Sequence, residues 1–419
     1  MRRLLLPTAL LLFSMSACET PGDDPPAAAA DAAPSYVAPS YPDSLLERAR
    51  ALTQRFILVD GHIDVPYRMT EFEEDITGPT DFGDFDYERA KAGGLDAPFM
   101  SIYIPARYQD TPDTGYAFAD SLIDMVEGFA TRAPDRYAIA TSVDDVRRNH
   151  EQGIISLPLG MENGAPIGDD LANLRHFYDR GIRYVTLTHG RDNQLSDSSY
   201  DTTRTHQGLS DFGLEVVDEM NRLGLIVDIS HLSDSAAFQV LRRSQAPVFA
   251  SHSSARRFTP DWERNMSDDL IRALAERDGV IMINFGSSFL NTRFQDESRP
   301  ARQRIDDEIE ARGLVEGTPE HAAFMHEQRR SNPFGSVTDV ADHIDHVVEL
   351  AGVDHVGIGS DYDGVTFLPA GLQDASTYPN LVAELLQRGY SEEDLQKILG
   401  ENALRVWSAV EAAARRLGS

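Results

Sequence analysis

The chain has 419 residues, 41% of them hydrophobic, which is enough for a globular protein with a large core. Its formal net charge of −30 at pH 7 excludes the basic surface that nucleic-acid binding requires. Lysine occurs only at Lys91 and Lys397, and neither lies at the end of a predicted strand. We therefore expect neither a Schiff-base mechanism nor a metal pair bridged by a modified lysine.

Residues 1–18 have the pattern of a bacterial export signal. Arg2 and Arg3 precede an apolar run from Leu4 to Phe13, and small residues lead from there to Cys18, the only cysteine of the chain. This order is typical of a secretory signal. A cysteine directly after the small residues resembles a lipobox, so we expect Cys18 to carry lipid; plain secretion is the alternative. The apolar run is shorter than the roughly 20 residues that a membrane-spanning helix needs.

Residues 19–42 are rich in Pro, Ala and Asp, which predicts an extended tether with little to bury. With the signal, this predicts an exported protein anchored by lipid alone at the bacterial cell envelope, in the periplasm or at the outer membrane. The body has no further cysteine, so a homodimer would be held by packing without a disulfide. One folded domain is expected over residues 43–419, opening with an amphipathic helix at 44–56.

Eight apolar runs of strand length follow along this domain, and helical patterns separate most of them. The runs begin near Phe56, Pro98, Ile154, Ile182, Leu225, Pro247, Gly279 and His355. An alternation of strands and helices that repeats eight times predicts an α/β fold, the closed parallel (β/α)8 barrel of TIM type. An open doubly wound sheet is the alternative, but no Gly-x-Gly-x-x-Gly turn follows the first run. Insertions are expected near 66–97 and 286–335, the second with helices around 301–312 and 319–330.

Acidic or imidazole side chains follow the ends of six of these runs. The residues are His62, Asp64, Glu162, His189, His231, His252 and Asp361. The carboxyl ends of parallel strands meet on the face of a barrel where ligands bind. Imidazole and carboxylate donors gathered there are typical of a divalent-metal centre. The sequence therefore predicts a metal-dependent hydrolase.

His62 and Asp64 are two residues apart on a strand, so their side chains point to the same face. Glu162 is the remaining group able to bridge two cations, because each carboxylate oxygen can take one metal. We expect one ion on His62, Asp64 and Glu162, and a second on Glu162, His231 and His252. Two ions about 3.5–4 Å apart can share a hydroxide, lower its pKa and polarise a scissile carbonyl.

Two of the strand-end residues remain outside this ligand set. Asp361 is expected to take the proton of the hydroxide and pass it to the leaving amine, and His189 to stabilise the oxyanion. The alternatives are a core histidine at 189 and a helix-entry turn at 361–364. Asp228 is expected to orient a ligand histidine. The other eight histidines are expected to be structural.

Several segments carry a family resemblance, in order between about residues 45 and 410. They are Asp60-Gly61-His62-Ile63-Asp64-Val65-Pro66, Gly160-Met161-Glu162, Leu187-Thr188-His189, Val227-Asp228-Ile229-Ser230-His231, Ser251-His252-Ser253-Ser254-Ala255-Arg256 and Gly357-Ile358-Gly359-Ser360-Asp361-Tyr362-Asp363-Gly364. The set resembles the membrane dipeptidase (renal dipeptidase) family of zinc peptidases, within the amidohydrolase-like barrels, and the lipobox resembles that of a bacterial lipoprotein member.

The resemblance implies two Zn²⁺ per chain on the five ligands proposed above, a substrate contact from His189 and proton handling by Asp361. It adds Arg264, which matches the family arginine that binds the terminal carboxylate of a dipeptide; a guanidinium fork fits a carboxylate. Ile63 stands where Asn is common, and Asn163 stands where the animal members have Gly, so the side-chain preference stays open.

The leading hypothesis is a lipid-anchored zinc dipeptidase that hydrolyses the amide bond of free dipeptides by metal-activated hydroxide. One alternative is another binuclear-metal amidase or lactamase, because such a site hydrolyses any well-placed carbonyl. The other is a non-catalytic lipoprotein that binds small peptides. Asp361 favours catalysis, because binding alone needs no proton shuttle.

Overall fold

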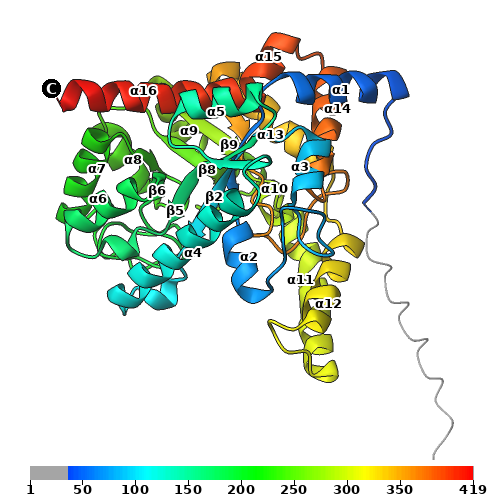
Figure 1. The fold of residues 1–419 in the computed structure, drawn as a ribbon, viewed down its shortest axis with the longest axis horizontal. Helices are drawn as coiled ribbons and strands as arrows, with labels where there is room; N and C mark the ends of the chain where they lie inside the picture. The colour runs from blue at the N-terminus through cyan, green and yellow to red at the C-terminus, as the bar shows by residue number, and fades with distance from the viewer. Residues whose placement is uncertain (1–35, 419) are drawn as a thin grey trace, which may run out of the picture. The chain divides into compact units, whose positions relative to one another are not determined.

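A computed structural model describes residues 36–418, in which eight parallel strands close into a barrel with helices around it (Figure 1). The strands follow one another around the barrel in the order β1, β10, β9, β8, β7, β6, β5, β2. Their bounds are β1 (Val59–Ile63), β2 (Ala97–Tyr103), β5 (Leu159–Glu162), β6 (Ile182–Thr186), β7 (Ile226–Asp228), β8 (Phe249–Ser253), β9 (Val280–Ile283) and β10 (Val356–Ile358). The predicted (β/α)8 barrel is confirmed.

The barrel strands are short apolar runs because both of their faces are buried. Every residue of β1, β5, β8, β9 and β10 is buried. Phe99 on β2 contacts Trp407, at a ring distance of 5.4 Å, on a helix that lies across one end of the barrel (Figure 1). An aromatic pair buried in this way fills the barrel interior at that end.

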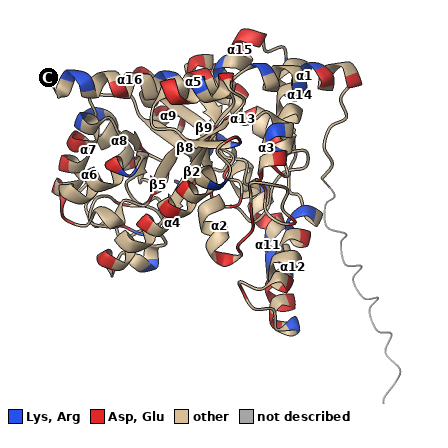
Figure 2. Ribbon diagram, in the orientation of Figure 1, with Lys and Arg blue, Asp and Glu red and all other residues tan. Residues whose placement is uncertain are grey.

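Serine residues begin many of the outer helices. Ser142, Ser210, Ser233, Ser267 and Ser391 each accept a hydrogen bond from the backbone N–H three residues on, which stabilises a helix start by about 1 kcal/mol. The helices outside the insertions are α1 (Asp43–Arg55), α4 (Pro112–Arg132), α5 (Val143–Glu151), α6 (Leu171–Asp179), α7 (Asp211–Leu223), α8 (Asp234–Arg243), α9 (Asp268–Glu276), α13 (Val337–Ala351), α14 (Tyr378–Gln387), α15 (Glu392–Gln396) and α16 (Asn402–Leu417). Acidic and basic positions are interspersed along them (Figure 2).

The apolar run from Ile154 differs from the prediction, because it forms two strands instead of one. β4 (Ile155–Leu157) pairs with β3 (Tyr137–Ile139) in a separate two-stranded sheet, and β5 enters the barrel. Pro158 lies between them; it has no N–H to donate, and its carbonyl accepts from Met100 at 2.8 Å. The proline inside an apolar run was the signal for this break.

The insertions have more helix than the sequence predicts. The first contains α2 (Val65–Glu71) and α3 (Tyr87–Gly93), and the second contains α10 (Ser287–Leu290), α11 (Thr292–Arg312) and α12 (Pro319–Ser331). The helix expected around 301–312 begins at Thr292, where the Asn291 side chain caps it, and continues through Pro300. Residues 292–331 form a helical hairpin that projects from the barrel (Figure 1).

The predicted signal 1–18, with Cys18, and the tether up to residue 35 lie outside the described residues. The last part of the expected tether, residues 36–42, does not extend away from the body. Tyr36 packs edge-on against Phe294 at 5.2 Å, and the buried Tyr41 donates to Glu384 at 2.9 Å. Across residues 36–418, the structure contains no helix with the length and apolarity to cross a membrane.

His343 on α13 joins the loop after β8 to α10. Its Nδ1 accepts the backbone N–H of Ala255 at 3.0 Å, so the proton is on Nε2, which donates to the carbonyl of Leu290 at 3.0 Å. Complete burial, aided by His346, lowers the pKa of His343 to about 4 despite the bond to Leu290. The folded protein therefore holds this imidazole neutral.

We expect this histidine to make folding pH-dependent. A lowered folded-state pKa contributes stability that is present above pH 6.5 and is lost as the pH falls towards 4. Between pH 7 and pH 4.5 the loss amounts to about 2 kcal/mol. Urea unfolding at the two pH values should show that His343→Gln loses less stability than the wild type by this amount. Equal losses in the two proteins would contradict the assignment.

Candidate metal centre

The barrel brings the seven predicted strand-end side chains together at the carboxyl ends of its strands. Six of them line one cavity of about 540 Å³: Asp64, Glu162, His189, His231, His252 and Asp361. The seventh, His62, is fully buried behind Glu162. The residues lie on β1, β5 and β8 or in the segments that follow β1, β6, β7 and β10, so the barrel topology itself produces the cluster.

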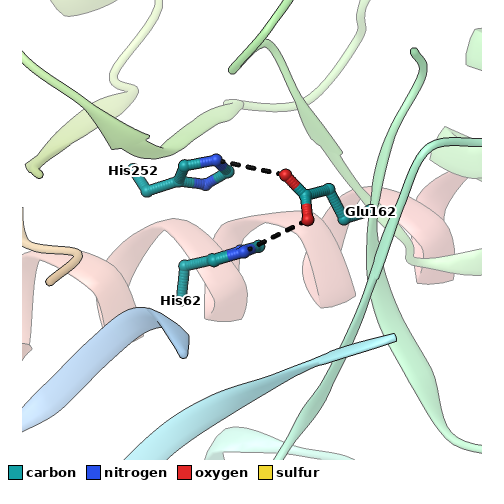
Figure 3. Close-up of side chains that lie close together, drawn as sticks. All are labelled: His62, Glu162 and His252. Carbon is teal, nitrogen blue, oxygen red and sulfur yellow. Dashed lines mark ion pairs between the residues drawn. The ribbon is translucent and has the colours of Figure 1, made fainter. Parts of the chain in front are cut away.

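Glu162 lies at the centre of this cluster. Its Oε1 is 3.0 Å from Nε2 of His231 and 3.4 Å from Nε2 of His252, and its Oε2 is 3.5 Å from Nε2 of His62. Figure 3 shows His62 and His252 pointing at different oxygens of the carboxylate. His189 approaches Oε1 as well, at 3.6 Å. A carboxylate with imidazoles at both oxygens has the arrangement that bridging of two cations requires.

The donor atoms form three overlapping groups, each with its atoms within 4.8 Å of one another. The groups are His62, Glu162 and His252; Glu162, His189 and His231; and His62, Asp64 and Asp361. His252 is close to expected ligands of both ions, because its ring centre lies 3.8 Å from that of His62 and its Nε2 lies 2.8 Å from Nε2 of His231. The distances therefore show the five expected ligands as one cluster, and they do not separate a ligand set for each ion.

The polar atoms of the cluster fit a cation better than a closed hydrogen-bond network. Nε2 of His62 and Oδ1 of Asp64 are buried and have no hydrogen-bond partner among the described residues. A buried polar atom without a partner costs about 1–3 kcal/mol, which coordination would remove. His231 and His252 also direct nitrogens at each other and at Glu162. Nitrogen and oxygen donors of this kind suit zinc.

The pKa values of most of these donors favour the protonation states that bind a cation. Burial opposes ionisation of Glu162, but His62 and His189 outweigh it and hold the pKa of the carboxyl well below its usual range. Burial, reinforced by nearby cationic groups, lowers the pKa of His231 and His252 well below the usual value. At His62, Tyr184, Asp64 and Glu162 outweigh burial and raise the pKa. Metal binding should therefore release a proton from His62.

Hydroxyl groups orient two of the imidazoles from behind. The Tyr184 hydroxyl lies 2.7 Å from Nδ1 of His62, and the Ser251 hydroxyl lies 2.8 Å from Nδ1 of His252. Ser251 also donates to Asp228 at 2.7 Å, so Asp228 reaches His252 through Ser251 and not directly. Sequence reasoning missed Tyr184 and Ser251, whose only signal is an inward-facing position on a barrel strand.

His189 is not a core histidine, because it lines the cavity and 23% of its side chain is exposed. Its ring contacts those of Tyr103 at 4.8 Å and His231 at 4.2 Å. Burial is the main cause that lowers its pKa. The structure therefore presents a neutral imidazole to the cavity, beside Glu162.

Asp361 lies in a turn and not at a helix entry, because the next α-helix begins at Tyr378. Its backbone is left-handed, with φ of 61°, and its N–H donates to the carbonyl of His62 at 3.0 Å. Asn284 donates to its Oδ2 at 2.7 Å. Burial and then the charge of Asp64 raise the pKa of Asp361 well above its usual value. Asn284 is a third residue that sequence reasoning missed.

Asp84 and Asp363 join the loop of the first insertion to the loop that carries Asp361. The Asp363 carboxylate accepts the N–H of Asp84 at 2.7 Å, and the Asp84 carboxylate accepts the N–H of Asp363 at 2.9 Å. Two arginines face this pair. Arg68 on α2 lies 3.0 Å from Asp363, and Arg329 on α12 lies 3.7 Å from Asp84. The pair thus joins both insertions to the Asp361 loop.

Arg264 is buried directly beside His231 and His252 and does not line the cavity. It donates to the carbonyl of His252 and to the Ser253 hydroxyl, both at 2.8 Å, and its NH2 lies 3.0 Å from Nε2 of His231. Its guanidinium lies 4.9 Å from the Phe289 ring centre, and its Nε has no partner among the described residues. One edge of the guanidinium is therefore fixed by the protein.

Comparison with known proteins gives a consistent result. The family model for membrane dipeptidase, peptidase family M19, matches residues 46–419. Dipeptidase aclJ of Aspergillus oryzae is 36% identical over 376 residues, which cover 87% of this chain and 80% of that protein. The crystal structure of the probable dipeptidase PvdM from Pseudomonas aeruginosa matches with a TM-score of 0.75 and 29% identity, over 89% of this chain and all of that one.

A metallopeptidase from Rhodobacter sphaeroides, solved with a phosphinate mimic of the dipeptide L-Ala-D-Ala, matches with a TM-score of 0.70 and 26% identity. The match covers 85% of this chain and 99% of that one. The family model spans nearly all of the described residues, including the whole barrel and the metal-ligand cluster. The chain therefore belongs to the membrane dipeptidase family, peptidase family M19.

Proposed function

We propose that this protein hydrolyses the amide bond of free dipeptides at a centre that holds two zinc ions. The observation that carries the proposal is the buried Glu162 carboxylate, which has imidazole nitrogens at both of its oxygens. Membership of a family of metal-dependent dipeptidases supports the reaction class. The dipeptide mimic bound to the Rhodobacter sphaeroides relative supports the substrate class.

In this proposal His62, Asp64 and Glu162 hold one ion, and Glu162, His231 and His252 hold the other. Bound zinc supplies Lewis-acid chemistry, which polarises the scissile carbonyl and lowers the pKa of water. The remaining steps fall to side chains of the chain itself, which bind the substrate, orient it and move its protons.

Asp361 is the proton carrier. Its carboxylate is close to the donors of the first ion and is held by Asn284, so it can accept a proton from the attacking water and return it to the leaving amine. In the protein without metal, burial and Asp64 raise its pKa; nearby cations favour the ionised form that accepts a proton. His189, neutral and facing the cavity, donates a hydrogen bond to the carbonyl oxygen as negative charge develops.

Arg264 binds the terminal carboxylate of the dipeptide. In the protein without metal, its NH2 rests against Nε2 of His231. An imidazole nitrogen that coordinates a cation has no lone pair left to accept this bond. With a cation held by His231, this N–H of Arg264 would be free for the substrate, while Ser253 and the carbonyl of His252 keep the rest of the guanidinium in place.

Replacing Glu162 tests the two-metal site. A glutamine has only one acceptor oxygen and cannot bridge two cations, so we expect Glu162→Gln to fall from two zinc ions per chain to fewer than one. Mass spectrometry of metals in protein dialysed against zinc-buffered solution measures the content. Glu215→Gln, on the exposed face of α7, is the matched control and should keep both ions. Two ions retained in Glu162→Gln would refute the bridge.

The reaction itself is tested with zinc-loaded protein and four substrates: L-Ala-L-Ala, L-Ala-D-Ala, and L-Ala-L-Ala blocked at either end. We expect free dipeptides to be cleaved and the blocked forms to be poor substrates. Asp361→Ala should lower kcat by about 10²–10⁴-fold, because general acid–base catalysis contributes that much, with the zinc content unchanged.

Each outcome of this panel separates one hypothesis from the others. Hydrolysis of the blocked amides without hydrolysis of free dipeptides would identify another amidase or lactamase. Binding without turnover in the zinc-loaded wild type would identify a peptide-binding protein. An unchanged kcat in Asp361→Ala would remove Asp361 from the reaction.

We also propose that the protein is exported and anchored at the cell envelope through lipid on Cys18. The support is the sequence of residues 1–18, with its basic start, apolar run and small residues before the cysteine. In a bacterial host, we expect Cys18→Ser to leave the membrane fraction and appear in the soluble periplasmic fraction. Intact mass measurement of the wild type should find a lipid mass at the new amino terminus. An unmodified cysteine in the membrane fraction would contradict the anchor.

A further inference from the structure

The cavity continues past the metal centre to the two insertions of the barrel. Its volume of about 540 Å³ lies in the range of about 300–1,000 Å³ that encloses drug-sized ligands, so it exceeds the needs of a small dipeptide backbone. Part of the lining lies between α2 and the helical hairpin 292–331; it includes Tyr67, Phe72, Phe82, Ala322 and Met325. We name these five residues the outer chamber.

We propose that the outer chamber binds a large apolar or aromatic side chain on the amino-terminal residue of the dipeptide. The inference rests on the proposed dipeptidase function and names the substrate class that the same site prefers. It concerns residues of the insertions and not the metal ligands.

The five residues of the outer chamber are aromatic or apolar, and the charged side chains of Arg68, Glu71, Arg302 and Arg329 line the cavity beside them. Phe72 and Phe82 contact each other edge-on at 5.6 Å, and Phe82 contacts the ring of His326 at 5.8 Å. Burial, with the charge of Arg330, lowers the pKa of His326 to about 4, so this ring is uncharged at neutral pH. Met325 adds a flexible, polarisable side chain from α12. An apolar ligand side chain is stabilised by leaving water here, and it gains aromatic contacts.

The position of the chamber selects the amino-terminal residue. The loop 361–365 forms the boundary between the metal centre and the hairpin. Gly364 lies against Asp64 and Asp361, so closely that a Cβ there would overlap both carboxylates, and Arg329 of the hairpin donates to the carbonyl of Val365. The chamber thus adjoins the Asp64 and Asp361 side of the centre.

Arg264 lies on the other side of the centre, beside His231 and His252. A dipeptide whose carboxylate faces Arg264 therefore places its amino-terminal residue towards Asp64 and Asp361, next to the outer chamber. The side chain of the carboxyl-terminal residue stays on the Arg264 side.

Two neighbouring alanines of α12 provide a matched test. Ala322 lines the outer chamber, whereas Ala323 is the next residue of the same helix and is exposed. Tryptophan at either position has the same helix propensity, so only the cavity distinguishes the variants. The measured quantity is the ratio of kcat/KM for L-Phe-Gly to kcat/KM for L-Ala-Gly with zinc-loaded full-length protein, alongside the same ratio for Gly-L-Phe and Gly-L-Ala.

Complete burial of a phenylalanine side chain is worth about 1.5–3 kcal/mol, or roughly 10–150-fold in kcat/KM. We expect the wild-type ratio for L-Phe-Gly to be at least about 10, to fall at least tenfold in Ala322→Trp, and to stay within twofold in Ala323→Trp. The ratio for the carboxyl-terminal pair should respond to neither variant. Met325→Ala enlarges the chamber and should raise the kcat/KM for L-Trp-Gly relative to that for L-Phe-Gly. This second variant tests the inference if Ala322→Trp does not fold.

Several results would overturn the inference. The first is a wild-type kcat/KM that is higher for L-Ala-Gly or L-Glu-Gly than for L-Phe-Gly. The second is a loss of kcat/KM in Ala322→Trp that is confined to the carboxyl-terminal pair, Gly-L-Phe and Gly-L-Ala. The third is an equal change of the L-Phe-Gly ratio in Ala322→Trp and Ala323→Trp. In each of these cases L-Ala-Gly is still hydrolysed, so the proposed function stands. Absence of L-Ala-Gly hydrolysis by the zinc-loaded wild type would instead count against the dipeptidase itself.

Discussion

The constraint on which the rest of the site depends is an ionised carboxylate buried among imidazoles, of which two, His231 and His252, are uncharged and one, His62, has a raised pKa. Glu162 is 4% exposed, and His231 and His252 face it without the positive charge that would compensate it. Removing an ion from water costs several kcal/mol unless opposite charge accompanies it. In the absence of metal, the packing of the barrel holds these groups together and His62, 3.5 Å from the carboxylate, is the imidazole that compensates its charge; bound cations would take over that role. The rigidity of the fold and the affinity for metal therefore have the same origin.

The sequence predicts which charged and imidazole groups gather at the candidate site, but it does not predict the residues that support them. Histidines and acids directly after apolar runs, such as His62 and Asp361, carry a strong signal because strand ends of a barrel converge. Tyr184, Ser251 and Asn284 orient those groups through single hydrogen bonds, and neutral polar residues are too common for their positions to stand out. Asp84 lies in a loop of the first insertion, and the hydrophobic periodicity of a sequence does not predict the course of a loop. The break of the third run at Pro158 had a local signal, whereas the early start of α11 did not.

The strand ends of the barrel and the two insertions contribute different parts of the site. Strand ends supply the groups proposed to hold cations and move protons, and these groups line the cavity, whereas Phe99 and Trp407 pack together at the other end of the barrel. The insertions build the walls of the cavity on that face. Arg329 contacts the Asp84 and Asp363 pair from α12, so the hairpin that shapes the cavity is fixed to the loop that carries Asp361. The hairpin and the Asp361 loop therefore share one group of ion pairs.

The seam at which the barrel closes lies inside the catalytic centre. β1 and β10 are neighbours; Asp60 accepts the N–H of Ser360, a residue 300 positions later, and the N–H of Asp64 donates to the carbonyl of Tyr362 at 2.8 Å. Synthesis from the amino terminus makes the first ligands long before the strand that precedes Asp361. Asp361 comes into place only through the contact between β1 and the segment that follows β10, because its N–H donates to the carbonyl of His62. Closure of the barrel and placement of the proposed proton carrier therefore depend on one contact between the first strand and the last.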